Sequence, residues 1–171
     1  MTPFSIGAAV TATALVASFV FGRLFGPTIT TEINIDAPSD VVWSVLADTA
    51  AYEDWNPFVR KISGDVQPGN RVSITVGAPG SKPMDFSPRI LVADPGAELR
   101  WIGHLGVPGL FDGEHFFVLQ DAGDGRTQLI HGERFTGVLV YPIMKMIGGE
   151  TRAGFKAMNA ALKTRAEAMT L

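Results

Sequence analysis

The chain has 171 residues, a length that suits one domain with a substantial hydrophobic core and is too short for two full enzyme domains. Its 14 basic and 17 acidic side chains give a net charge of −3, so no positive surplus exists to neutralise phosphates and no nucleic-acid partner is expected. Because the chain has no cysteine, disulfides, zinc-thiolate sites, iron–sulfur clusters and cysteine nucleophiles are excluded.

Residues 1–25 are predicted to form an N-terminal hydrophobic helix, ahead of a single globular domain over residues 26–171. Residues 4–22 carry no charged side chain, and Arg23 ends the run. A bilayer is crossed by about 20 mostly apolar residues, so we expect a single-pass membrane anchor here. The positive charge of Arg23 favours a cytoplasmic globular domain. Two alternatives stay open: a cleaved signal peptide, which would export the domain, and a soluble helix.

The first part of the globular domain reads as a strand followed by short helices. Residues 29–36 alternate between apolar and polar side chains, the period of a half-buried strand. A helix is predicted over 38–48, with Pro38 in its first turn, and a second helical piece over 50–53. Six further strands are predicted, separated by turns rich in glycine, proline and aspartate: 59–66, 71–76, 84–93, 98–105, 114–120 and 127–138.

The C-terminal segment returns to a helical period. Phe155, Met158, Leu162, Ala166 and Met169 form one apolar stripe, whereas four polar residues face elsewhere: Lys156, Asn159, Lys163 and Glu167. The stripe extends backward across Gly148-Gly149, where two helix-weakening glycines predict a bend or a break. One long helix among antiparallel strands must bury its stripe against a sheet face. The sequence therefore predicts an α+β domain in which a curved sheet of about seven strands wraps round this helix and leaves room between them.

Several segments resemble the SRPBCC superfamily, whose members include START and polyketide cyclase/dehydrase-like proteins. The matching stretches run in the family's order from Ile29 to Met169: Ala37-Pro38 with Val42-Trp43, Tyr52 with 55–58 (WNPF), 111–115 (FDGEH), 131–137 (HGERFTG), and 155–167 with MNAALK at 158–163. The resemblance implies a helix-grip fold, in which the sheet grips the C-terminal helix around an apolar cavity. It implies much less about function, because this fold serves carriers, receptors and enzymes alike.

The last predicted strand carries the two residues most suited to chemistry. Leu129, His131, Glu133 and Phe135 share one face by the period of two, and the bulky apolar pair indicates that this face points inward. His131 and Glu133 would then project into an apolar cavity, where burial shifts both pKa values towards neutrality. They could bind a polar group of a ligand or act as general acid and base. A hydrogen-bonded pair within the core is the structural alternative, and it stays open.

His115 repeats this arrangement on the preceding strand. Together with His131 and Glu133 it has the composition of a two-histidine, one-carboxylate metal site, but the three lie at no tight ligand spacing. We therefore expect no metal and no cofactor. His104 falls on the opposite strand face from Trp101 and is predicted to lie at the surface.

Two glycine- and proline-bearing loops, over 77–83 and 103–113, are predicted to form the lips of the cavity, with ordinary turns as the alternative. An apolar, largely aromatic lining with few polar groups is typical of a ligand pocket. The predicted ligand-binding residues are Trp55, Phe86, Trp101, His115, Phe117, His131, Glu133, Phe135, Phe155 and Met158.

The sequence thus favours a membrane-tethered protein that binds a hydrophobic or amphipathic small molecule or a lipid. A cyclase/dehydrase-like enzyme that uses His131 and Glu133 is the first alternative. An accessory module whose sheet binds another protein is the second. The ligand and the oligomeric state do not follow from the sequence.

Overall fold

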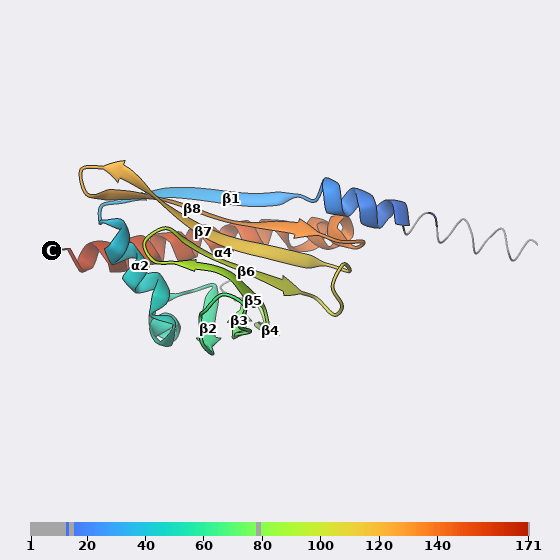
Figure 1. Cartoon of the computed structure of the whole chain (residues 1–171), viewed down its shortest axis with the longest axis horizontal. Coiled ribbons are helices and arrows are strands. Elements are labelled where there is room, and N and C mark those ends of the chain that lie inside the picture. Colours follow the sequence, from blue (N-terminus) through green and yellow to red (C-terminus); the bar gives the residue numbers. More distant parts are fainter. Residues whose placement is uncertain (1–12, 14–15, 78–79, 171) are drawn as a thin grey trace, which may run out of the picture.

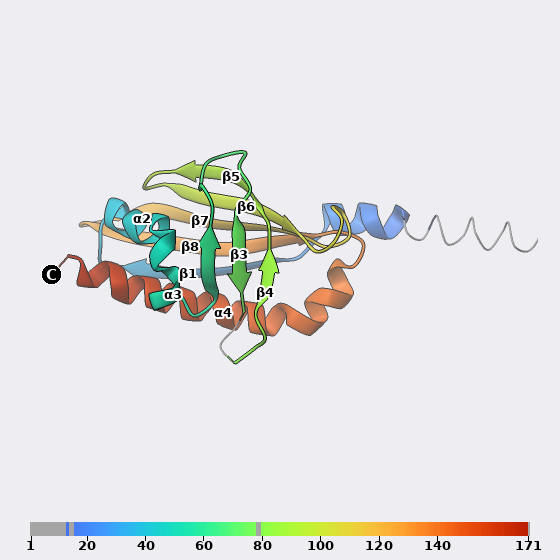
Figure 2. The same cartoon turned by 90° about the horizontal axis from the view of Figure 1, so that it is seen from below.

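The computed structural model describes residues 13, 16–77 and 80–170 and shows the predicted α+β helix-grip architecture (Figure 1). A long sheet and a long C-terminal helix lie along each other, with short helices and a smaller sheet beside them (Figures 1 and 2). The elements are β1 Thr28–Ile35, α2 Ser39–Ala47, η1 Thr49–Ala51, α3 Tyr52–Trp55, β2 Val59–Ser63, β3 Ser73–Val76, β4 Met84–Phe86, β5 Arg89–Asp94, β6 Glu98–His104, β7 Asp112–Gly123, β8 Arg126–Thr136 and α4 Val140–Ala168.

The strands form two antiparallel sheets. The larger has the order β1-β8-β7-β6-β5 and the smaller the order β2-β3-β4. In the larger sheet, Trp101 lies opposite His115, and His115 lies opposite Glu133. Directly opposed residues point to the same face. This register therefore places an aromatic ring, an imidazole and a carboxyl group side by side on the inner face.

The segment 84–93, predicted as one strand, is two strands that belong to different sheets. β4 pairs with β3 in the smaller sheet, whereas β5 pairs with β6 at the edge of the larger one. Pro88 lies between them, and because proline has no N–H to give to a ladder, the chain leaves one sheet there and joins the other. Periodicity predicts that residues are extended, but it does not identify the neighbouring strand.

Helix α4 continues without interruption through Gly148 and Gly149, so the chain does not break there. Its N-terminal part, drawn in orange, turns away from the line of the rest (Figure 2). The apolar stripe of the helix is buried as predicted, because Phe155, Met158 and Leu162 have no exposed surface.

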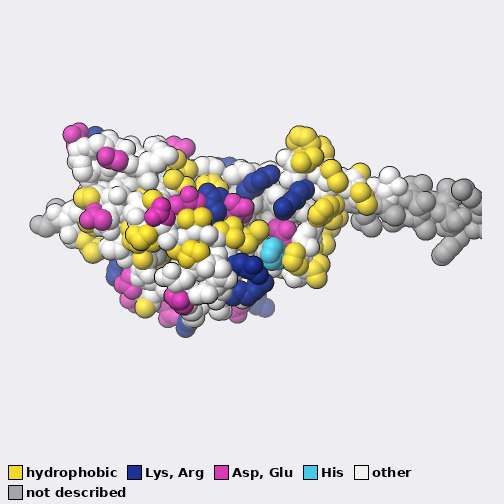
Figure 3. Space-filling model, viewed as in Figure 1, with side chains coloured by type: hydrophobic (Ala, Val, Ile, Leu, Met, Phe, Trp, Pro, Cys, Tyr) yellow, Lys and Arg dark blue, Asp and Glu magenta, His cyan; other side chains and the backbone are white. Residues whose placement is uncertain are grey.

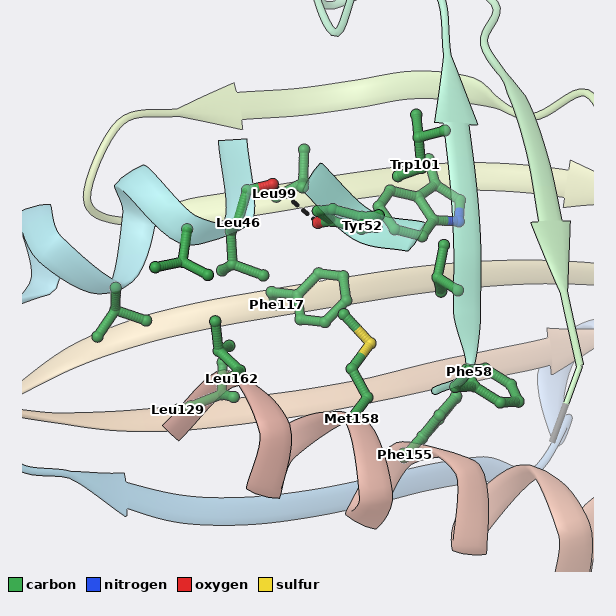
Figure 4. Close-up of a cluster of buried hydrophobic side chains, with 14 of the residues drawn as sticks. Leu46, Tyr52, Phe58, Leu99, Trp101, Phe117, Leu129, Phe155, Met158 and Leu162 are labelled. Carbon is green, nitrogen blue, oxygen red and sulfur yellow. Dashed lines mark hydrogen bonds between the residues drawn. The ribbon is translucent and has the colours of Figure 1, made fainter. Parts of the chain in front are cut away.

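The space between the C-terminal part of α4 and the sheet is filled by large side chains (Figure 4). Helices α2 and α3 contribute Leu46 and Tyr52 to it, and the Tyr52 hydroxyl donates to the carbonyl oxygen of Leu46 at 2.8 Å. We call this region the packed half; its fully buried residues are Leu46, Tyr52, Phe117, Leu129, Met158 and Leu162.

In the N-terminal segment, residues 16–24 are helical and lie against the start of α4 (Figure 1). The Tyr141 hydroxyl donates to the carbonyl oxygen of Phe25 at 2.8 Å, and a Cβ added at Gly22 would lie 2.3 Å from the carbonyl oxygen of Gly137. Within the described residues, no helix combines the length and the apolarity needed to span a bilayer. Much of the predicted anchor over 4–22 lies outside those residues, so the anchor stays a prediction.

Candidate functional site

A cavity of about 200 Å³ lies between the smaller sheet, the ends of β6, β7 and β8, and the N-terminal part of α4. Its wall is mainly apolar, and polar groups enter it at a few positions. Such a wall is typical of small-molecule sites. The apolar wall includes Phe58, Ile74, Val76, Met84, Phe86, Trp101, Leu105, Phe111, Phe135 and Ile147.

The volume limits what this cavity can hold. An apolar cavity of about 150 Å³ is known to hold benzene, and sites for drug-sized ligands measure about 300–1,000 Å³. At about 200 Å³, the cavity has room for one substituted ring or a short chain. A larger molecule would have to protrude through the opening or displace the lips.

The structure divides the ten predicted ligand-binding residues into two groups. Five line the cavity: Phe86, Trp101, His115, Glu133 and Phe135. The other five do not line it: Trp55, Phe117, His131, Phe155 and Met158. These five pack within or against the hydrophobic core. The period of two predicts which residues point inward, but it does not predict whether the space in front of them is filled. Contact of any of the ten with a ligand stays a prediction.

Both predicted loops border the cavity. From the first loop, Gly77, Ser81 and Lys82 reach its wall, and from the second, Leu105 and Phe111 do so. Their predicted position as lips is therefore confirmed for the described residues. Residues 78 and 79 lie outside the described part of the chain.

A chain of polar side chains runs from the cavity wall into the core. The Glu133 Oε2 atom lies 3.4 Å from His115 Nδ1, and His115 Nε2 lies 2.8 Å from His131 Nε2. His131 Nδ1 lies 2.6 Å from Asn159 Oδ1, and Asn159 Nδ2 donates to Thr31 Oγ1 at 2.9 Å. Glu133 and His115 line the cavity, whereas His131, Asn159 and Thr31 are buried behind them.

Burial favours the uncharged form of each titratable group in this chain. It raises the pKa of Glu133 to about 8 and lowers the pKa of His115 to about 3. The pKa of His131 is also lowered, first by burial and then by the neighbouring His115, against the effect of the hydrogen bond that His131 donates to Asn159. Because the neutral form of each group is favoured, Glu133 and His115 meet as a carboxylic acid and an uncharged imidazole rather than as an ion pair.

Two neighbours fix the position of the pair. The Trp101 ring stacks on His115, with centroids 4.7 Å apart and planes tilted by 10°. A Cβ added at Gly113 would lie 2.0 Å from Glu133 Oε1, so the carboxyl group occupies space that only glycine leaves free. The inner face of the sheet therefore holds both groups against the cavity.

Asn159 is a residue of this site that the sequence did not reveal. It was predicted on the outward face of the helix with Lys156, Lys163 and Glu167, but it is only 2% exposed. The prediction failed because α4 packs against β1 as well as against the sheet centre, and Asn159 faces Thr31 of β1. Its spacing, four residues after Phe155 and three before Leu162, is the signal that could have placed it at the edge of the stripe.

His104 was predicted to lie at the surface, and its side chain is 22% exposed, but it also has a place in the cavity wall. Its Nδ1 atom lies 2.8 Å from Asp112 Oδ1. The same carboxylate accepts the backbone N–H of Gly109, with both oxygens 2.9 Å from the nitrogen. These contacts tie the second lip to the end of β6.

The histidines and Glu133 form a line rather than a cluster around a common point. Each ring nitrogen of His131 faces a neighbouring side chain, one on His115 and one on Asn159. In the described part of the chain, no group of three or more histidine, cysteine, aspartate or glutamate residues could hold a metal ion.

Fold and site together define a helix-grip protein with a small, largely apolar cavity whose wall includes the adjoining Glu133 carboxyl group and His115 imidazole. Residues 27–167 match the family described as polyketide cyclase/dehydrase and lipid transport, and the chain belongs to this family. The predicted membership of the SRPBCC superfamily is thereby confirmed.

Solved structures share the fold at low sequence identity. An aromatase/cyclase from Streptomyces sp. R1128 is 19% identical, with a TM-score of 0.69 over 85% of this chain and 96% of that one. Norcoclaurine synthase from Thalictrum flavum is 15% identical, with a TM-score of 0.65 over 85% and 96%. A START superfamily protein from Mycobacterium smegmatis is 19% identical, with a TM-score of 0.63 over 83% and 98%. No curated protein sequence matches the chain.

Proposed function

We propose that this protein binds a hydrophobic or amphipathic small molecule in the cavity, with a polar group of the ligand at the Glu133–His115 end. One observation carries the proposal: a largely apolar cavity of about 200 Å³ has the adjoining side chains of Glu133 and His115 in its wall. Burial of apolar ligand surface supplies affinity, about 25 cal/mol for each Å² removed from water. The polar end fixes the orientation of the ligand.

We further propose that residues 4–22 tether the protein to a membrane, with the globular domain in the cytoplasm. The uncharged run supports this, and so do apolar side chains on the helical residues 16–24, where Val16 is 62% and Leu24 63% exposed. The ring of Phe19 lies beside Gly109 in the second lip of the cavity. Hydrophobic side chains gather at the end of the molecule where the N-terminal helix joins it (Figure 3). Tethering would keep the cavity close to ligands that partition into the bilayer.

A lipid is the larger candidate ligand. The cavity volume admits only part of an acyl chain, so lipid binding requires the lips over 77–83 and 103–113 to move apart.

A cyclase/dehydrase-like enzyme is the second candidate function, and one observation favours it. The carboxyl group of Glu133 and the Nδ1 atom of His115 meet at the cavity wall, so a bound carbonyl compound could exchange a proton with them. His131 was the histidine predicted for this chemistry, but it reaches the cavity only through His115. If the protein is an enzyme, Glu133→Gln abolishes turnover and leaves ligand binding intact.

Binding of ethylbenzene, followed by shifts of backbone amide NMR signals, tests the proposed function. The variant Ile147→Trp places a large ring in the cavity wall, and we expect it to weaken binding at least about tenfold. Met146→Trp is the matched control, because Met146 is the adjacent residue on α4 and is 80% exposed. No saturable binding by the wild type, or equal binding by both variants, would contradict the proposal. Partner proteins that co-purify with a protein that binds no small molecule would favour an interaction module instead.

A further inference from the structure

The buried end of the polar chain fixes where its protons lie. The Thr31 hydroxyl donates to the carbonyl oxygen of His131 at 3.1 Å, so its lone pairs must accept from Asn159. This requirement orients the amide, with its nitrogen towards Thr31 and its oxygen towards His131. The amide oxygen lies 2.6 Å from His131 Nδ1, and an oxygen at that distance requires a proton on the nitrogen.

The proton positions then follow along the chain. His131 is neutral and holds its one proton on Nδ1, so its Nε2 has only a lone pair. His115 Nε2, 2.8 Å away, must donate to that lone pair. His115 therefore keeps its proton on Nε2, and its Nδ1 is bare. The rings of Phe117 and Phe155 lie with centroids 4.2–5.0 Å from the two imidazoles, an apolar environment in which a charged ring is costly.

Bare His115 Nδ1 faces the Glu133 carboxyl group at the cavity wall. Two lone pairs facing each other there would repel, and burial raises the pKa of Glu133, so the carboxyl group is the partner that carries a proton. The separation of 3.4 Å exceeds the range of about 2.5–3.2 Å in which such hydrogen bonds are strong. Glu133 thus has a donor, and His115 an acceptor, that are poorly satisfied by each other.

We propose that Asn159 is a positioning residue that sets the polar end of the cavity to one O–H donor on Glu133 and one bare acceptor on His115, and thereby selects neutral ligands that carry a hydroxyl group. A ligand hydroxyl accepts from Glu133 and donates to His115 Nδ1 at once. A methyl group in its place satisfies neither, and a carboxylate cannot donate to the bare nitrogen. This inference rests on the proposed binding function and adds the chemical class of the ligand.

Nitrogen-15 NMR of the imidazole rings in the wild-type protein tests the proton positions without any substitution. At pH 7 we expect His131 in the Nδ1–H form and His115 in the Nε2–H form, both uncharged. A protonated ring, or the reverse pair of tautomers, would overturn the inference and leave the proposed binding function untouched.

Affinities for 4-ethylphenol and 4-ethyltoluene, two ligands of nearly equal shape, test the selectivity. We expect the phenol to bind at least about tenfold more tightly, since the toluene leaves two buried polar groups unsatisfied. Asn159→Leu should reduce this ratio to less than about threefold, because nothing then fixes the His131 proton on Nδ1 and keeps His115 Nδ1 bare. Asn159 does not line the cavity, so it acts on the ligand only through the two histidines. Lys156→Leu, an exposed position on the same helix, is the matched control and should keep the wild-type ratio.

Each outcome of this binding experiment has a separate meaning. Equal affinities of the wild type for the two ligands would overturn the inference while confirming that the cavity binds small molecules. An unchanged ratio in a folded Asn159→Leu variant would also overturn it. Failure of both ligands to bind the wild type would contradict the proposed function itself. The imidazole NMR keeps the inference testable should Asn159→Leu fail to fold.

Discussion

The same helix meets the same sheet in two different ways along its length. In the packed half, α2 and α3 place the fully buried side chains of Leu46 and Tyr52 between α4 and the sheet (Figure 4). In the other half, which we call the cavity half, the smaller sheet and the N-terminal part of α4 line a cavity of about 200 Å³. The α4 face in the packed half is apolar, whereas in the cavity half the helix presents Ile147 together with Glu150 and Thr151. The covering elements and the side chains of α4 therefore both differ between the core and the cavity.

The two halves should differ most in how much the free energy of unfolding falls when a large side chain is truncated. Leu162→Ala in the packed half should lower the free energy of unfolding by about 2–5 kcal/mol, because Leu162 is fully buried and leaves a void. Ile147→Ala on the cavity wall should cost less than about 2 kcal/mol, because Ile147 is only half-buried. Urea denaturation measures both values. Equal costs would mean that the cavity half is as tightly packed as the other.

The boundary between the halves is set by a close approach of α4 to Phe58. A Cβ added at Gly154 would lie 2.2 Å from Phe58 Cδ2, so Gly154→Ala should destabilise the protein by about 1–3 kcal/mol. Gly149→Ala is the control on the same helix: its Cβ meets open space, and the substitution should stabilise the helix by up to about 1 kcal/mol. Thermal unfolding of the two variants should therefore shift in opposite directions. A shift in the same direction would contradict the packing described at this boundary.

The polar end of the cavity half predicts an unusual dependence of stability on pH. The folded protein keeps the Glu133 proton up to a pKa of about 8, whereas an unfolded chain loses it near 4.5, so this group destabilises the fold as pH rises through that window. His115 and His131 act in the opposite way, because unfolded histidines take up protons below about 6.5 and the folded ones do not. The three groups together predict a maximum near pH 6.5.

Glu133→Gln isolates the carboxyl group in this balance. Between pH 6.5 and 8 the wild type should lose up to about 2 kcal/mol of stability relative to the variant. Urea denaturation of both proteins across this range gives the difference, and other titrating groups cancel in it. Parallel pH curves for the two proteins would show that Glu133 is already ionised in the folded state.

The fold was predictable because its pattern is strong and local. Each pattern, the alternation over 29–36 and the stripe from Phe155 to Ala166, depends only on which face of its own element is buried. The structure buries the predicted face of the strand and the predicted stripe of the helix. The division of 84–93 between two sheets was not predictable, since strand pairing is a non-local choice.

The site was predictable only in part, for a related reason. His115 and Glu133 were found because they share the inner sheet face with bulky apolar residues. Asn159 was missed because its burial depends on β1, which precedes it by 128 residues in the hydrogen bond to Thr31. Five of the ten predicted residues do not line the cavity. Their positions follow from packing in three dimensions, which the period of a strand or helix does not predict.

A crystal structure of the protein with 4-ethylphenol would show whether the cavity holds a hydroxyl-bearing ligand. We expect one ligand molecule in the cavity half, with its ring between Trp101 and Phe135 and its oxygen within hydrogen-bond distance of both Glu133 and His115 Nδ1. An empty cavity at saturating ligand, or a ligand bound elsewhere on the protein, would contradict this expectation.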